Sequence, residues 1–257
     1  MKKTLSLLAV SALLVGIFTV PVEASHSWGF YHWGRTENPF TLQLGNNTSG
    51  TWTGLLGTAS SNWSLSAVLD TTVVAGGTRA KVCRPTSGRV EVCNASYGNN
   101  GWLGLAQIWI TGGTHITQGT VKNNDYYFMN EAEKLHVICQ EIGHTFGLDH
   151  QSTNGSSLNT CMDYYNNTSN ADTLSTLPNK HDYEELAVIY GHMDSFTTIK
   201  TLVSKAFGLS TALVAKDDAG DSDWGKATHN DPKGRANVFE KDLGNGNKVL
   251  THVFWAE

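Results

Sequence analysis

The sequence lacks an excess of basic residues. Its 18 lysine and arginine residues are outnumbered by 23 aspartate and glutamate residues, and the formal net charge is −5 at pH 7. Proteins that bind nucleic acids usually carry a concentrated basic surface, because they must neutralise phosphates. The charge balance therefore argues against a nucleic-acid partner.

The chain also lacks a long apolar run outside its first residues, so we expect no transmembrane helix in residues 25–257. The one apolar run, Leu5–Val20, follows two lysines and ends at Pro21. It is short for a membrane anchor, which is the alternative interpretation. We predict that residues 1–24 are a secretory signal peptide. Secretion, or release into a periplasm, with no membrane association after cleavage would follow.

Cysteine is scarce, with four residues in the chain and none before Cys83. In an exported protein we expect these cysteines to form disulfides. Four cysteines allow three pairings, and we favour Cys83–Cys93 together with Cys139–Cys161. The first would staple a short hairpin around the turn signal at residues 85–88. Free thiols or a cysteine-ligated metal are the alternative.

Apolar periodicity predicts an α+β fold. Period-two patterns predict strands at 40–44, 71–74, 103–110, 114–121, 238–243 and 249–256, with two more strands flanking the first disulfide. Helical patterns cover 51–69, a segment that begins at the capping residue Asn130, and 178–190.

The most informative stretch carries Gln140, Glu141, His144, Gly147 and His150. The first and third of these are four residues apart, so on a helix they share one face. Glycine takes positive φ without steric cost, so Gly147 can end the helix and turn the chain back. His150 can then reach the same point in space as His144. Three potential ligands and one carboxylate converging on a point is the geometry of a catalytic zinc site.

We therefore predict that Gln140, His144 and His150 bind Zn²⁺ and leave a fourth position for water. Zinc lowers the pKa of a bound water towards about 7, and Glu141 could then accept its proton. Because the amide of Gln140 is neutral and a poorer donor than imidazole, we expect it to loosen zinc binding.

This stretch resembles the metzincin metalloprotease signature H-E-x-x-H-x-x-G-x-x-H at every fixed position except the first, where Gln140 stands for histidine. Residues 159–164 resemble the downstream turn that carries the family's methionine. The resemblance implies that Met162 forms an apolar floor beneath the zinc. It also implies that Tyr164 contacts the zinc or stabilises the oxyanion, as in the astacin- and serralysin-like branches.

The resemblance further implies a metzincin-like catalytic domain at residues 25–194, with a twisted mixed sheet, an active-site helix and a C-terminal helix. In this family an edge strand binds the substrate backbone, and residues 101–110 take that place by their order in the chain. Residues 195–257 match no motif, and we expect a small β-rich extension of unknown role. With so few residues before the first strand, we expect no long propeptide.

Other histidines and one acidic stretch offer weaker candidates. We expect His115 to be a solvated or hydrogen-bonded strand residue, and His181 and His192 to be capping or surface groups, in preference to ligands. His136 lies about 12 Å along the helix from His144, too far to share its zinc, so it is expected beside the site or at the surface. The acidic residues 217–223 favour a solvated loop over a Ca²⁺ site, because their spacing does not fit an EF-hand.

Two functional hypotheses follow. The first is a secreted zinc-dependent metalloendopeptidase that acts on extended polypeptide, which Glu141 and Tyr164 favour. The second is a catalytically inactive metzincin-fold protein that binds a peptide or protein, which Gln140 favours.

Overall fold

A computed structural model describes residues 25–165, 169–199 and 223–256. The predicted signal peptide, and all of the acidic stretch except Asp223, lie outside the described residues. Within the described ranges, no helix is both long enough and apolar enough to cross a membrane.

The fold is α+β and is built on one mixed nine-stranded sheet. Its strands are β1 (His32–Trp33), β2 (Phe40–Asn47), β3 (Leu69–Ala75), β4 (Val90–Ala95), β5 (Trp102–Thr111), β6 (His115–Asn124), β7 (Lys226–Asn230), β8 (Ala236–Gly244) and β9 (Asn247–Trp255). The strand order is β3-β2-β4-β6-β5-β9-β8-β7, and β1 pairs with β6. The pairings among β1, β2, β3, β4 and β6 are parallel, and those from β6 through β5 to β7 are antiparallel.

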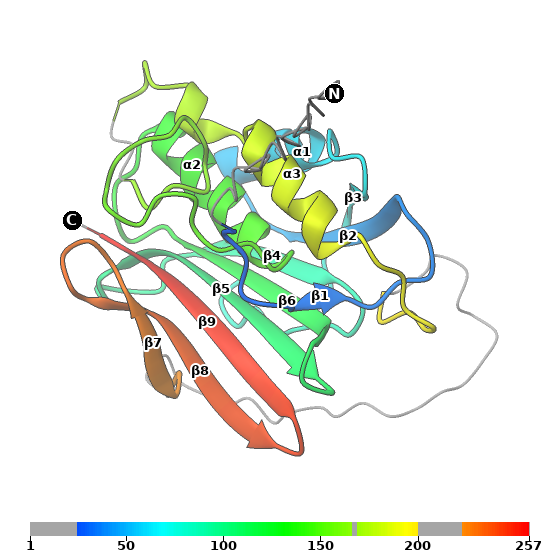
Figure 1. Ribbon diagram of the computed structural model, residues 1–257. Helices are drawn as coiled ribbons and strands as arrows, with labels where there is room; N and C mark the ends of the chain where they lie inside the picture. Colours follow the sequence, from blue (N-terminus) through cyan, green and yellow to red (C-terminus); the bar gives the residue numbers. More distant parts are fainter. Residues whose placement is uncertain (1–24, 166–168, 200–222, 257) are drawn as a thin grey trace, which may run out of the picture.

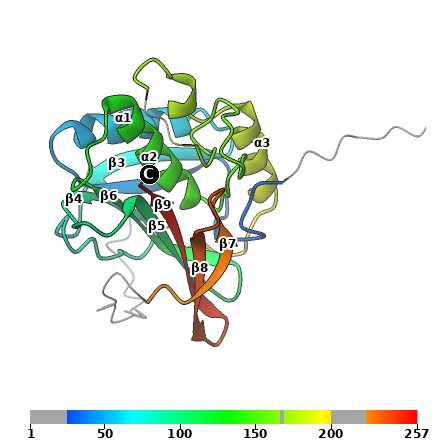
Figure 2. The ribbon, with the colours of Figure 1, turned by 90° about the vertical axis from the view of Figure 1, so that its left-hand side faces the viewer.

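Three α-helices of the described chain lie on one face of this sheet (Figures 1 and 2). They are α1 (Thr51–Trp63), α2 (Glu131–His144) and α3 (Lys180–Ile189), and a short 3₁₀ helix η1 (Leu174–Thr176) precedes the last. The predicted cap of α2 is confirmed, since the side chain of Asn130 accepts a hydrogen bond of 2.9 Å from the backbone N–H of Glu133. The first helix is shorter than the predicted segment 51–69. It ends at Trp63 with Ser64 as its C-cap, and β3 already begins at Leu69.

The apolar face of α2 packs between α1 and the sheet. Val137, Ile138 and Ile142 are fully buried there, and Trp63 of α1 reaches across to donate a 3.1 Å hydrogen bond from its indole N–H to the carbonyl of Cys139. Large buried side chains fix the height and rotation of this helix above the sheet, which sets where its polar residues point.

Both favoured disulfides, Cys83–Cys93 and Cys139–Cys161, are present. The hairpin predicted around the first is wrong, because Cys83 lies in a loop and only Cys93 is in a strand. That strand, β4, is parallel to both of its neighbours, so the residues before it form a crossover instead of an antiparallel partner.

The prediction that residues 101–110 form an exposed edge is also wrong. This segment is β5, and it pairs on one side with β6 and on the other with β9 (Figure 1). The predicted C-terminal hairpin exists as β8 and β9. Its strand β9 pairs with β5, at the edge predicted to bind a substrate peptide. The same strand, β9, contacts α2 through His252 and Glu141.

Candidate metal centre

The C-terminal half of α2 presents Gln140, Glu141 and His144, all fully buried. The chain then turns at Gly147, whose φ is +95°, and a Cβ there would collide with the backbone carbonyl of Tyr31. Only glycine fits this turn, as the sequence predicts. The turn returns the chain so that the rings of His144 and His150 lie edge to face, with centroids 4.8 Å apart.

A third histidine completes the cluster, and it comes from β9. Its ring, His252, lies 3.9 Å from the ring of His144 and 4.7 Å from that of His150, centroid to centroid. One potential ligand atom of each of the three residues lies within 4.8 Å of the others. The C-terminal strand therefore supplies a candidate ligand to the site that α2 begins.

Each of the three rings is held through its Nδ1 atom. His144 donates from Nδ1 to the carbonyl of Leu148 at 2.9 Å, and His252 Nδ1 lies 3.0 Å from Glu141 Oε2. His150 Nδ1 lies 3.4 Å from a carboxylate oxygen of the preceding residue. An anchored Nδ1–H leaves the lone pair of a neutral imidazole on Nε2.

The Nε2 atoms of His144, His150 and His252 are all buried and have no hydrogen-bond partner. Buried polar atoms are rarely left unpaired, because desolvation without a partner is costly. Three unpaired lone pairs in one small volume fit a metal ion, and the Glu141–His252 contact is the carboxylate–histidine arrangement that commonly supports a metal ligand. The three histidines could bind a metal ion.

Burial controls the protonation of these groups. It lowers the pKa of His144 and of His252 well below the usual range, with neighbouring histidines adding to the effect. Burial likewise raises the pKa of the Glu141 carboxyl well above its usual value. For Asp149, burial would raise the pKa, but hydrogen bonds and charge from His150 outweigh it and hold the pKa below its usual range. Neutral histidines are the form that binds metal.

Gln140 is turned towards the loop that contains Met162. Its Nε2 donates to the carbonyls of Cys161 at 2.9 Å and Asp163 at 2.6 Å, while its Oε1 is buried without a hydrogen-bond partner. Together with the adjacent Cys139–Cys161 disulfide, these bonds lock α2 to that loop. The orphaned Oε1 is the atom with which Gln140 could act as a ligand.

The two carboxylate oxygens of Glu141 have different surroundings. Oε2 faces His252, and Oε1 is buried without a hydrogen-bond partner. Gly104 of β5 leaves the room that the carboxylate occupies, because a Cβ at that position would lie 2.8 Å from Oε1. The sequence predicts a base at this position, and the structure adds contact with a histidine of the C-terminal strand.

Tyr164 and Met162 lie beside the cluster. The ring of Tyr164 meets that of His150 edge to face at 5.1 Å, and its hydroxyl donates to Asp231 at 3.5 Å and accepts from the backbone N–H of Trp255 at 3.3 Å. Burial raises the pKa of this phenol. Met162 is fully buried under α2, where a Cβ on Gly143 would collide with its sulfur.

The N-terminal segment covers the cluster. Trp28 stacks on His144 with ring centroids 4.9 Å apart and planes 5° from parallel. The same indole lines a pocket of about 480 Å³ that also touches Asp149, Glu240 and Leu250. This pocket lies between the N-terminal segment and the C-terminal hairpin, and its lining includes Asp149, the residue before His150.

Other predicted candidates do not join the cluster. His136 is buried and not at the surface, and its Nδ1 donates to the carbonyl of Ser175 at 2.5 Å. Burial lowers its pKa to about 4. His181 stacks on His26 at 4.9 Å.

Sequence reasoning missed His252. The alternation of residues 249–256 identifies the strand, and within it His252 shares the buried face with Leu250 and Phe254. A histidine on an apolar strand face was the one available signal. No spacing rule links it to a motif that ends 102 positions earlier.

Neither a search of family models nor a search of curated proteins returns a match to this chain.

Proposed function

We propose that the protein is a secreted zinc metalloendopeptidase of the metzincin type, in which His252 replaces the histidine absent at position 140. The observation that carries the proposal is the clustering of His144, His150 and His252, which have one potential ligand atom each within 4.8 Å of the others and a buried, unpaired Nε2. Three protein ligands with room for a fourth are typical of catalytic zinc sites, whereas structural sites usually have four. Imidazole ligands suit zinc among the common divalent metals.

Bound zinc would supply a Lewis acid and an acidified water molecule. Glu141 has the oxygen needed to accept a proton, because Oε1 is unpaired while Oε2 continues to orient His252. Tyr164, whose ring lies against His150, could donate to a developing oxyanion if its hydroxyl left the long 3.5 Å hydrogen bond to Asp231. Polypeptide is the proposed substrate, and the two disulfides are consistent with an oxidising, extracellular location.

A second candidate is a metal-binding protein without peptidase activity. It is favoured by the pairing of β9 with β5, which occupies the strand position proposed for substrate, and by the burial of the candidate ligands. In this case Gln140 Oε1 could fill the fourth position, which would leave no place for water.

The two candidates are separated by cleavage of a mixed peptide library with the purified wild-type protein and the Glu141→Gln variant. Glutamine can accept the same hydrogen bond from His252 but cannot act as a base, so zinc should stay bound while cleavage falls by about 10²–10⁴-fold. Glu184→Gln, on the exposed face of α3, is the matched control and should cleave like wild type.

Cleavage that a chelator stops and Glu141→Gln abolishes would support the peptidase. One bound zinc per site without cleavage in any condition would support the second candidate. Failure of the wild-type protein to bind zinc through His144 would contradict both.

A further inference from the structure

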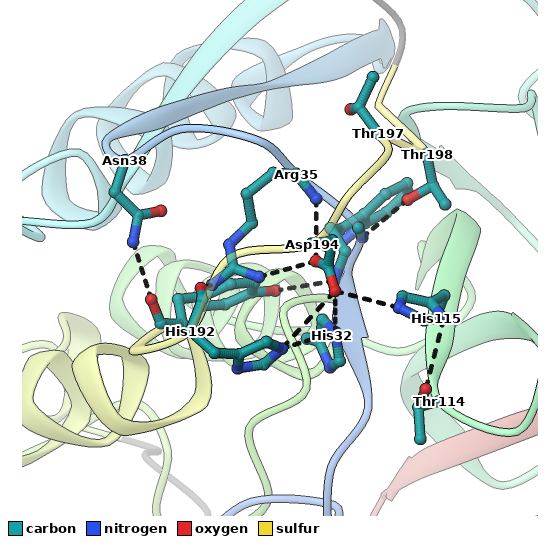
Figure 3. Close-up of polar contacts among 12 residues, drawn as sticks. His32, Arg35, Asn38, Thr114, His115, His192, Asp194, Thr197 and Thr198 are labelled. Atoms are coloured by element: carbon teal, nitrogen blue, oxygen red, sulfur yellow. Dashed lines mark hydrogen bonds and ion pairs between the residues drawn. The ribbon is translucent and has the colours of Figure 1, made fainter.

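A second group of histidines surrounds the carboxylate of Asp194 (Figure 3). Its members are His32 on β1, His115 on β6, and His192 and Asp194 in the segment that follows α3. Strands β1 and β6 pair in parallel with His32 directly opposite His115, so the sheet register itself brings these two rings together. None of the four residues belongs to the cluster around His144.

Asp194 is fixed so that one oxygen faces the rings. Its Oδ2 accepts hydrogen bonds from the backbone N–H of Arg35 at 3.1 Å and from the Arg35 guanidinium at 2.9 Å. The guanidinium also donates to the carbonyl of His192. Arg35 is almost fully buried, so the carboxylate and the adjacent chain are held firmly. Oδ1 is left to the three histidines.

Three of these side chains are close enough to share an ion, because one potential ligand atom of each of His32, His115 and Asp194 lies within 4.8 Å of the others. From Asp194 Oδ1 the Nε2 atoms of His32, His115 and His192 lie at 3.4, 3.2 and 3.7 Å, and the Nε2 atoms of His32 and His192 lie 3.1 Å apart. Bonds of about 2.0–2.1 Å from a central zinc would separate tetrahedral ligand atoms by roughly 3.3–3.4 Å. The distances from Asp194 Oδ1 to His32 and His115 are close to this value, and the His192 ring lies beside His32.

Hydrogen bonds within the group leave one contact, between His32 Nε2 and Asp194 Oδ1 at 3.4 Å, without a proton when the His32 ring is neutral. His32 donates from Nδ1 to the carbonyl of Phe30 at 2.6 Å, so its neutral ring has a lone pair on Nε2 that faces a carboxylate oxygen and another ring nitrogen. The Nε2–H groups of His192 and His115 can donate to His32 Nε2 and to Asp194 Oδ1, but the lone pairs of these two acceptors still face each other. A cation between them removes this repulsion.

We propose that His32, His115 and Asp194, joined by the exposed ring of His192 as a fourth ligand, form a second metal site that takes Zn²⁺ or a divalent cation of similar ligand preference. Four protein ligands leave no open position, so the role is structural. The ion would clamp the N-terminal segment to the sheet and to the chain that follows α3. That segment also carries Trp28, which stacks on His144, so the second ion would steady one wall of the first site.

The test is the zinc content and zinc affinity of the full secreted chain and three single variants. His192→Asn removes one ligand whose side chain is 52 % exposed, so the substitution opens no cavity in the core. His144→Asn removes a ligand of the first site. His229→Asn, an exposed histidine on β7 outside both groups, is the matched control.

We expect two zinc ions per wild-type chain and per His229→Asn chain. In His192→Asn one of the two should bind at least about 10–100-fold more weakly in chelator competition, while the other keeps its affinity. One zinc lost through His192→Asn but not through His144→Asn would support the second site and contradict the first. A zinc content and affinity unchanged by His192→Asn would overturn the proposal, whatever the result at His144.

Discussion

His252 on β9 and Glu141 on α2 are 111 positions apart in the sequence, yet His252 Nδ1 lies 3.0 Å from Glu141 Oε2 in the buried centre of the protein. The contact joins the last strand of the chain to the helix that carries the zinc-protease-like motif. It orients a third imidazole towards two others, and this imidazole is our proposed replacement for the ligand that the motif lacks at position 140. The C-terminal hairpin is therefore part of the candidate site.

Replacing His252 should weaken zinc binding at the first site. We expect His252→Asn to lower zinc affinity by at least about 10–100-fold, because a ligand and its carboxylate support are lost together. Chelator competition measures the change, with His229→Asn as the control. Unaltered affinity would mean that β9 contributes no ligand.

Replacing Gln140 should destabilise the fold. Gln140→Met keeps the volume of the side chain but removes its hydrogen bonds to the carbonyls of Cys161 and Asp163. The Asp163 carbonyl keeps the N–H of Tyr165 as a donor, whereas the Cys161 carbonyl is left unsatisfied. An unsatisfied buried carbonyl costs about 1–3 kcal/mol, so the free energy of unfolding should fall by about that amount in urea titrations. Gln118→Met, on a partly exposed part of β6, should change it little. Equal stability of the two variants would show that the Gln140 amide does not hold the loop.

The two disulfides should differ in their effect on metal binding. Removing Cys139 and Cys161 together should cost about 2–4 kcal/mol of stability and weaken zinc binding, because the disulfide ties α2 to the loop of Met162. Removing Cys83 and Cys93 should lower stability without changing zinc affinity. Chemical denaturation and chelator competition on both double alanine variants check this. Equal zinc affinities in the two would contradict a supporting role for Cys139–Cys161.

His136 should make the metal-free protein sensitive to mild acid. Its pKa is lowered by burial from 6.5 to about 4, so between these values the unfolded chain binds the extra proton more readily than the folded one. Stability from this group is complete above pH 6.5 and falls as the pH drops towards 4, by about 3 kcal/mol in all. Burial raises the pKa of Asp182 to about 7, so that group changes stability with pH in the opposite direction. The difference in unfolding free energy between wild type and His136→Leu, measured at each pH, isolates the contribution of His136. A stability difference that stays constant with pH would contradict this assignment.

Local chemistry in the sequence predicts much of the fold around the site. The cap at Asn130, the turn at Gly147, both disulfides and the β8–β9 hairpin depend on neighbouring residues or on simple periodicity, and all are present. The pairing of β9 with β5 depends on contacts between distant segments, and no period or spacing encodes it. The same limit applies to the grouping of His115 with Asp194, which the register of β1 and the path of the chain after α3 decide.

The most direct test of the candidate metal centre is a crystal of the full secreted chain grown with zinc, with anomalous scattering recorded at the zinc edge. We predict a peak bonded to the Nε2 atoms of His144, His150 and His252, with Glu141 still on the far nitrogen of His252. The absence of a peak at this place, or zinc bound by His144 and His150 with His252 outside bonding distance, would contradict it.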